Sequence, residues 1–162
     1  MKKFVFSVCA LFAAATISFA QDVNEATDYF NAAVEYLNLG DKATALDKFQ
    51  KAYDIAKECG EAGQALVDQC ESTIPQLALM VAKDYVKAGD YETAVAKAKE
   101  ASAIAAAMNA DASVAEAEAL IPNIYMQQGN NLLKAKDYEG AIKAYTANVA
   151  INPSNGKAYV NM

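Results

Sequence analysis

The side chains of this chain that could do chemistry are its carboxylates, lysines, hydroxyls and thiols, and they form no familiar catalytic set. Among the 162 residues there is no His, so the commonest general base and metal ligand is missing. Without a His base, the Ser and Thr hydroxyls cannot form a familiar nucleophilic triad. Carboxylate pairs such as Glu116 and Glu118 fall on different faces of a helix, where we expect them to be solvated. We therefore expect no catalysis and no cofactor, and an enzyme that uses paired carboxylates is the remote alternative.

Cys59 and Cys70 are the thiols outside the N-terminal leader, and they bear on metal binding and on redox state. Two ligands cannot make a closed zinc site, which takes four, so we expect no metal. An exported protein could oxidise the pair to a disulfide. If the helices on either side of residues 60–63 run antiparallel, the two cysteines would lie at different positions along the helix axes, roughly 10 Å apart. A disulfide needs Cα atoms within about 7 Å. Two separate buried thiols are therefore favoured, and a disulfide is the alternative.

The charge balance is acidic and argues against nucleic acid as a partner. All 14 cationic side chains are Lys, against 20 carboxylates, which gives a net charge of −6. The chain has no Arg, so it lacks the forked donor suited to phosphate and guanine. We therefore expect no nucleic-acid binding.

The first 20 residues have the pattern of a secretory leader. Lys2 and Lys3 form a short positive region, an apolar stretch follows at residues 4–15, and Ser18-Phe19-Ala20 carries small residues where a signal peptidase reads them. We predict a signal peptide over residues 1–20, cleavage after Ala20, and export to the periplasm or the cell exterior. The alternative is an uncleaved membrane anchor, but the stretch is short for a span. No other segment resembles a span, so we expect no stable membrane span after cleavage.

Three segments of the remaining chain align with one another, and each consists of an amphipathic helix, a short turn and a second helix. They are YFNAAVEYLNLGDKATALDKFQKAY, IPQLALMVAKDYVKAGDYETAVAKAKEA and IPNIYMQQGNNLLKAKDYEGAIKAYTANVAINP. Similarity that recurs along the chain indicates a helical repeat protein. Abundant Ala, with only 3 Pro and 7 Gly, favours helix over strand. The sequence therefore predicts an all-α fold.

Small residues stand at equivalent places in the two helices of each segment. The pairs are Ala33 with Ala45, Ala82 with Ala94, and Gly129 with Ala141. Close contact between helices needs short side chains where the helices cross. We therefore predict that each pair marks the crossing of two helices.

Each turn carries residues that end one helix and begin the next. Gly40 and Gly89 can adopt the left-handed conformation that closes a helix. Asp41, Asp90 and Asp137 each directly follow a turn, where an aspartate can accept a hydrogen bond from the first turn of the next helix. The sequence therefore predicts an N-cap at each of the three aspartates.

These features resemble the tetratricopeptide repeat, whose two helices cross at small residues and carry aromatic residues around the crossing. Tyr36 and Tyr85 match the aromatic site of the first helix, and Phe49 and Tyr145 match that of the second. The resemblance covers nearly all of the chain after the leader. It implies a short right-handed α-solenoid of tetratricopeptide-like helical hairpins, with about three repeats and the start of a fourth.

The spacing between these repeats is longer than the roughly 34 residues of the usual motif. The extra residues favour helix, so we predict that they extend the next first helix backwards, and that Pro75 and Pro122 kink this long helix or begin a new one. Asn148 is a departure, because the motif prefers Ala at its position. The domain would cover residues 21–162, with repeats at about 26–58, 62–107 and 112–154 and a partial repeat at 155–162.

The resemblance also implies that the first helices line a concave groove that receives a peptide or a partner's helix. The positions that carry over are Phe30, Asn31 and Val34, then Leu79, Met80, Lys83 and Lys87, and finally Met126, Gln127, Asn130 and Lys134. Phe30, Leu79 and Met126 are equivalent and apolar, which suits a peptide with hydrophobic anchors, while the lysines suit an acidic group. The alternative is that these residues belong to the core, as apolar residues at helical spacing usually do.

The sequence thus indicates an exported scaffold that binds protein or peptide partners without a chemical step. The alternative is the N-terminal docking module of a longer cell-envelope protein whose activity lies beyond Met162. Some tetratricopeptide proteins grip the C-terminus of a chaperone, but here Met126 stands where that clamp needs Lys, and Arg is absent. We therefore do not expect this ligand. The exposed ends of a short repeat array can stack, so self-association is open.

Overall fold

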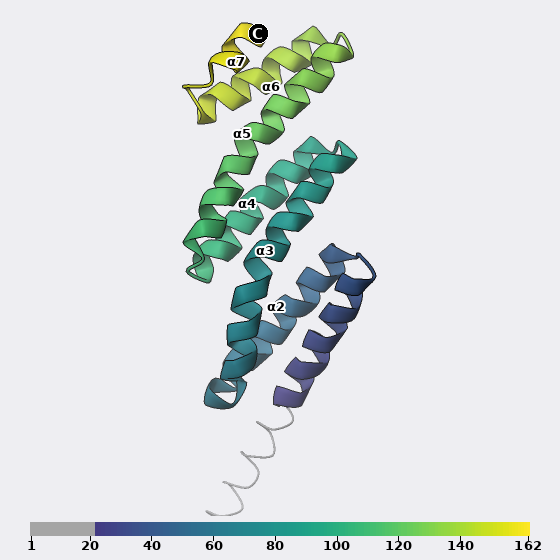
Figure 1. Cartoon of the computed structure of the whole chain (residues 1–162), viewed down its shortest axis with the longest axis vertical. Coiled ribbons are helices and arrows are strands. Elements are labelled where there is room, and N and C mark those ends of the chain that lie inside the picture. Colours follow the sequence, from purple (N-terminus) through teal and green to yellow (C-terminus); the bar gives the residue numbers. More distant parts are fainter. Residues whose placement is uncertain (1–21) are drawn as a thin grey trace, which may run out of the picture. The chain divides into compact units, whose positions relative to one another are not determined.

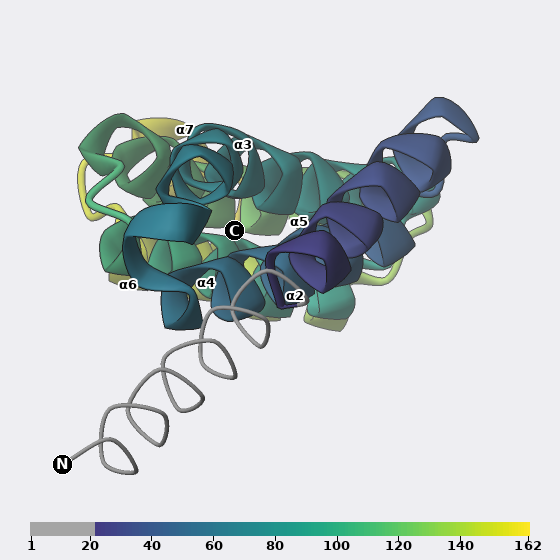
Figure 2. The same ribbon diagram turned by 90° about the horizontal axis from the view of Figure 1, so that it is seen from below.

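The structure is a computed structural model that describes residues 22–162. Every regular element in this part of the chain is a helix, and adjacent helices pack in pairs (Figure 1, Figure 2). The predicted all-α class is therefore confirmed. The predicted signal peptide, residues 1–20, lies outside the described residues.

Short turns join the helices, and the chain divides into two compact units. In order, the elements are a helix at residues 22–38, α2 (Lys42–Glu58), the 3-10 helix η1 (Gly60–Gly63), α3 (Gln64–Ala88), α4 (Tyr91–Ala107), α5 (Asp111–Lys134), α6 (Tyr138–Ile151) and α7 (Gly156–Asn161). The first unit ends at Ile74 and the second covers Pro75–Met162. Helix α3 therefore begins in one unit and ends in the other.

Helices α3 and α5 are long, with 25 and 24 residues. Each contains a proline, Pro75 in α3 and Pro122 in α5, and each continues as helix on both sides of it. A proline removes one hydrogen bond of the helix, and burial of the neighbouring Ile74 and Ile121 offsets that loss. The predicted backward extension of the first helices is confirmed.

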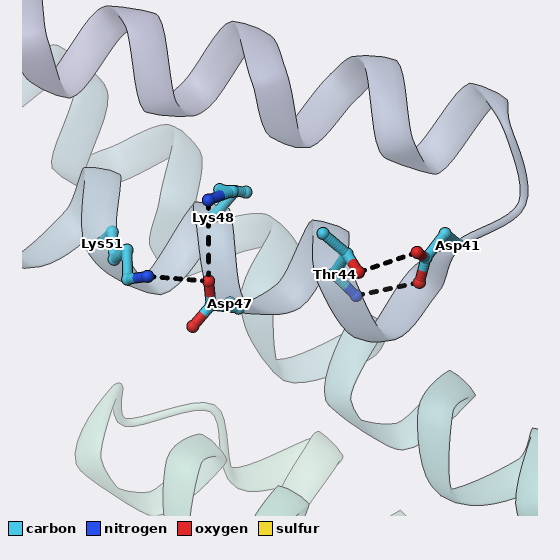
Figure 3. Close-up of polar contacts among 5 residues, drawn as sticks. All are labelled: Asp41, Thr44, Asp47, Lys48 and Lys51. Carbon is cyan, nitrogen blue, oxygen red and sulfur yellow. Dashed lines mark hydrogen bonds and ion pairs between the residues drawn. The ribbon is translucent and has the colours of Figure 1, made fainter.

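The three predicted N-caps are all formed. The carboxylates of Asp41, Asp90 and Asp137 accept hydrogen bonds from the backbone N–H three residues on, at 3.0, 3.1 and 2.9 Å. Figure 3 shows Asp41, whose bonds from the Thr44 N–H and hydroxyl hold the pKa of this carboxyl below its usual value. It also shows Asp47 on the same helix, 3.0 Å from the Lys51 ammonium.

Two of the three turns use a glycine at positive φ, and the third does not. Gly40 and Gly89 have φ values of +83° and +80°, in the region that favours glycine. At the equivalent place before α6, Lys136 has a φ of +64°. The third pair therefore has the same short turn, but Lys136 adopts the left-handed conformation there at a cost in backbone energy that glycine would not incur.

The predicted crossing residues are buried. Ala33, Ala45, Ala82, Ala94 and Ala141 are all buried, and so is Gly129. The third crossing leaves no room for a side chain at residue 129, because a Cβ placed on Gly129 would lie 2.5 Å from the ring of Tyr145. That ring is fully buried in a cluster with Ala141 and Ala158, so the absence of a side chain at residue 129 leaves the space that Tyr145 fills.

We expect Gly129→Ala to lower the free energy of unfolding by about 1–3 kcal/mol, even though Ala is the better helix former. The ring of Tyr145 cannot easily move aside, since it is buried and its hydroxyl is bonded to Asn130. Gly156→Ala is the matched control, because a Cβ there meets nothing within 4 Å. Urea unfolding measures both variants, and a Gly129→Ala protein as stable as the parent would contradict this account of the crossing.

Cys59 and Cys70 are separate, buried thiols, which is the favoured of the two alternatives from the sequence. The Cys59 Sγ lies 3.2 Å from the carbonyl oxygen of Ile55, to which it donates. Burial raises the pKa of both thiols, and that of Cys70 reaches about 11, with the nearby Glu71 acting in the same direction. Both groups are therefore protonated at neutral pH and make poor nucleophiles.

The raised pKa of Cys70 predicts a loss of stability in alkali. The thiol of the unfolded chain ionises near its usual value of 9.0, and that of the folded chain near 11. As pH rises through this window, the unfolded state loses its proton first, so the free energy of unfolding falls between about pH 9 and pH 11. We expect Cys70→Ala to reduce that slope in urea unfolding curves measured across the window. Equal slopes in parent and variant would contradict the prediction.

Candidate functional site

In the first unit, the predicted groove residues divide between core and surface. The Phe30 ring packs edge-on against the buried Phe49 ring, with centroids 5.1 Å apart and planes at 77°. Asn31 and Val34, by contrast, are exposed. Phe30 is half-buried. Part of its ring packs in the core, and only the exposed part is available to contact a ligand.

In helix α3, the two apolar candidates have opposite environments. Leu79 is only 1% exposed, whereas its neighbour Met80 is 47% exposed. The side chain of Leu79 therefore belongs to the core, as the alternative interpretation of the sequence anticipated, and it is not available to a ligand in this structure. An accessible apolar stripe does not run through all three equivalent positions.

The two lysines predicted for this part of the groove already have acidic partners. The Lys83 ammonium lies 2.6 Å from the Glu116 carboxylate of α5, and Lys87 lies 3.0 Å from Asp84. On the same side, the Gln76 amide donates to the Ser113 hydroxyl at 2.9 Å. The Lys83–Glu116 and Gln76–Ser113 contacts tie α3 to α5 within the second unit. The ion pair also leaves Lys83 less free to attract an acidic group from a ligand.

Two of the third repeat's candidates, Met126 and Asn130, lie together at a hollow between α5 and α7. Its volume is about 380 Å³, and we call it the α5–α7 hollow. The residues lining it are Met126, Asn130, Gly156, Lys157, Val160 and Asn161. Gln127 and Lys134 are exposed and are not among these lining residues.

Hydrogen bonds orient the polar side chains at the α5–α7 hollow. The Asn130 amide oxygen accepts from the Tyr145 hydroxyl at 2.9 Å and from the Asn161 amide nitrogen at 3.4 Å. With its oxygen occupied in this way, Asn130 has only its NH₂ group left as a donor, and no residue in the described range 22–162 accepts from it. Lys157 is exposed and forms no ion pair within that range. The hollow therefore combines apolar walls with unused N–H donors.

Two asparagines, Asn148 and Asn155, hold α7 in place, and the sequence analysis did not predict this role for them. The buried Asn148 donates to the Pro122 carbonyl of α5 at 2.5 Å and accepts from the Asn155 amide at 2.8 Å. Asn155 in turn caps α7 by accepting from the Ala158 N–H at 3.4 Å. The signal was present in the sequence, since Asn148 replaces the Ala that the repeat pattern prefers, but its partners are distant along the chain.

We expect Asn148→Ala to release α7 from the rest of the second unit. It would leave the Asn155 amide without its acceptor and remove a side-chain bond to the Pro122 carbonyl of α5, at a cost of about 1–3 kcal/mol. Limited proteolysis should then cut faster at residues 152–156, and urea unfolding should show the lost stability. Asn123→Ala, an exposed position on α5, is the control. Unchanged proteolysis in the Asn148 variant would contradict a tethering role.

A second hollow lies in the first unit. It has a volume of about 320 Å³ and is lined by Glu25, Asp28, Tyr29, Ala32 and Lys48. The Lys48 ammonium lies 5.5 Å from the centroid of the Tyr29 ring, within the range of a cation–π contact. Because the Lys48 ammonium already covers the Tyr29 ring, which is the aromatic ring that lines this hollow, we assign no ligand to the hollow.

The described residues also bear on metals and membranes. Within residues 22–162, no group of three or more Cys, Asp or Glu side chains is placed to hold a metal ion. The helices of the same range include none that is both long and apolar enough to traverse a bilayer.

Comparisons with protein-family models, with curated proteins and with solved structures gave no match to this chain.

Proposed function

We propose that this chain is a binding module of the tetratricopeptide type, whose helix pairs stack into a short right-handed solenoid and hold a segment of a partner protein. Three features of the pairs support the proposal. They repeat the same aspartate N-cap, they bury small residues at equivalent places, and each places a turn of a few residues between its helices. A surface built this way is preformed, so binding needs little reorganisation.

The observation that carries the proposal is the α5–α7 hollow. Met126 and Asn130 lie on α5, the first helix of its pair, where the tetratricopeptide resemblance puts the ligand groove. They line this hollow, whose volume is about 380 Å³. Concave sites with apolar walls and a few oriented polar groups are the usual form of binding sites. The hydrogen bonds from Tyr145 and Asn161 fix the orientation of Asn130 before a ligand arrives.

The residues that line this hollow indicate which kind of ligand would fit it. Met126 and Val160 can receive an apolar side chain, and the flexible thioether of Met adapts to several shapes. The Asn130 NH₂ group and the Lys157 ammonium are donors, and they suit a carboxylate close to that anchor. Lys83 is less suited to this role, because Glu116 already lies 2.6 Å from its ammonium. The ligand that fits is a peptide segment with an apolar anchor beside an acidic group.

We propose no chemical step, and we place the binding outside the cytoplasm. The chain has no His to act as a general base, and the pKa values of its two buried thiols are raised rather than lowered. Residues 1–20 carry the charge and hydrophobic pattern of a secretory leader. The protein would therefore work as an exported scaffold.

Selection of a random peptide library on the purified full chain tests the proposal. We expect the enriched peptides to share a large apolar residue followed closely by Asp or Glu. Lys157→Glu should shift the selection towards Lys or Arg, because it reverses the charge at the rim of the hollow. For one enriched peptide, Met126→Ala should weaken binding by about tenfold, as the loss of an anchor contact commonly does.

The matched control is Lys99→Glu, which makes the same charge change at another exposed lysine, on α4. It should leave the selected peptides unchanged. Absence of any enriched motif, or a motif insensitive to Lys157→Glu, would contradict the binding role assigned to the hollow.

A further inference from the structure

A third hollow lies between α4 and α5 in the second unit, and we call it the α4–α5 hollow. It has a volume of about 270 Å³ and is lined by Tyr91, Glu92, Val95, Tyr125 and Gln128. Both tyrosine rings pack against the buried core cluster that contains Val95. The Tyr91 hydroxyl oxygen also accepts a hydrogen bond from the Asn131 amide of α5. The core therefore holds both rings at the hollow before any ligand is bound.

The polar groups at the α4–α5 hollow lack partners in the described part of the chain. The exposed Glu92 carboxylate forms no ion pair and accepts no hydrogen bond from residues 22–162. The Tyr125 hydroxyl and the Gln128 amide likewise have no hydrogen-bond partner in that range. No lysine is among the lining residues, and the chain has no Arg. A carboxylate beside aromatic rings attracts a cation, and the described chain places none there.

The equivalent place on the first helix already holds a cation. Tyr29 lies four residues before Ala33, as Tyr125 lies four residues before Gly129, and Tyr29 also lines a hollow. There the Lys48 ammonium lies 5.5 Å from the centroid of the Tyr29 ring. In the first unit, the chain therefore supplies its own cation to this tyrosine.

The residue that supplies this cation has no counterpart in the third pair. Lys48 lies three residues after Ala45, and the residue three after Ala141 is Ala144, which is buried. Within residues 22–162, no ammonium lies over the Tyr125 ring. The third pair therefore has the tyrosine of the first pair without the cation that covers it.

A second tyrosine of the first unit shows the same combination of groups. The Lys57 ammonium lies 5.1 Å from the centroid of the Tyr53 ring, and the Tyr53 hydroxyl donates to the Glu71 carboxylate at 3.0 Å. Tyrosine, cation and carboxylate therefore meet there within one chain. The α4–α5 hollow has the tyrosine and the carboxylate, and a ligand would have to bring the cation.

We propose that the α4–α5 hollow binds the guanidinium group of an arginine side chain on a partner peptide. A planar guanidinium stacks on an aromatic ring while its N–H groups donate to a carboxylate. The Tyr125 ring would cover its face, the Glu92 carboxylate would accept two of its N–H groups, and the Gln128 amide oxygen would accept a third. An ammonium is more strongly hydrated and has no plane to stack, so arginine is favoured over lysine. A volume of about 270 Å³ suits one side chain.

This site is separate from the α5–α7 hollow. At helical spacing, Tyr125 and Gln128 lie on one side of α5, and Met126 and Asn130 lie on another. The two hollows also select different ligands, one an arginine and the other an apolar residue beside an acidic group. Failure of one proposal therefore leaves the other standing.

An NMR titration of the isotope-labelled full chain tests the inference, with the peptide acetyl-Gly-Arg-Gly-amide as the probe. We expect saturable shifts of the backbone amide signals of residues 91–95 and 125–128. The dissociation constant should be on the order of 1 mM, as suits contacts with a single side chain. The same peptide with citrulline, which has the shape of arginine without its charge, should not bind. The lysine peptide should bind about fivefold more weakly than the arginine peptide.

Three variants locate the site. Glu92→Gln should weaken binding of the arginine peptide by about tenfold, because it removes the charge that the guanidinium meets. Gln128→Lys should abolish binding, because it would supply the chain's own cation to the hollow, as Lys48 does in the first unit. Asp111→Asn is the matched control. It also removes one negative charge, at the other end of α5 and about 21 Å from Tyr125 by helix rise, and it should bind as the parent does.

The absence of a saturable shift in the parent overturns the proposal, and so does binding that Glu92→Gln leaves unchanged. Equal binding of the arginine and citrulline peptides would show that charge is not recognised, and would overturn it as well. A lysine peptide that binds as tightly as the arginine peptide would contradict the assignment of a guanidinium. Shifts confined to the residues that line the α5–α7 hollow would place the arginine elsewhere and contradict the site.

Discussion

Paired helices in this protein can approach closely because the residues at their crossings have little or no side chain. The third pair shows how much follows from this constraint. Gly129 leaves the space that the Tyr145 ring fills, the buried ring carries its hydroxyl to Asn130, and Asn130 meets Asn161 of α7. A hollow with oriented donors thus depends on one missing Cβ, because tight packing permits few other positions for the ring.

Helix α7 is held by tertiary contacts, since a helix of six residues is not stable by itself. The buried Asn148 connects the backbone of α5 to the residue that caps α7. Burying an amide is costly unless its donors and acceptor are satisfied, and here both ends of Asn148 have partners. The pair of residues Asn148 and Asn155 therefore fixes α7 in one position, and with it one wall of the proposed binding site.

Residues at equivalent places in the helix pairs differ in how far they are buried. Glu25 and Asp28 are exposed, whereas the residues at the same places in α3, Ile74 and Leu77, are buried. The fifth residues of α2, α4 and α6 are Leu46, Val95 and Ile142, and only Ile142 is exposed. These differences become visible only when the helices are compared position by position in the structure.

The sequence by itself determined the features that depend on neighbours within a few residues. The aspartate caps and the turns at Gly40 and Gly89 were predictable, because helix ends are set by local hydrogen bonds and backbone conformation. The backward extension of α3 and α5 was predictable too, but whether Pro75 and Pro122 lie inside a helix or begin a new one was left open. Tertiary structure alone decided that Leu79 is buried, that Lys83 pairs with Glu116, and that Asn130 faces α7. Helical periodicity shows which residues share a face, but which other helix covers that face depends on contacts between residues far apart in the chain.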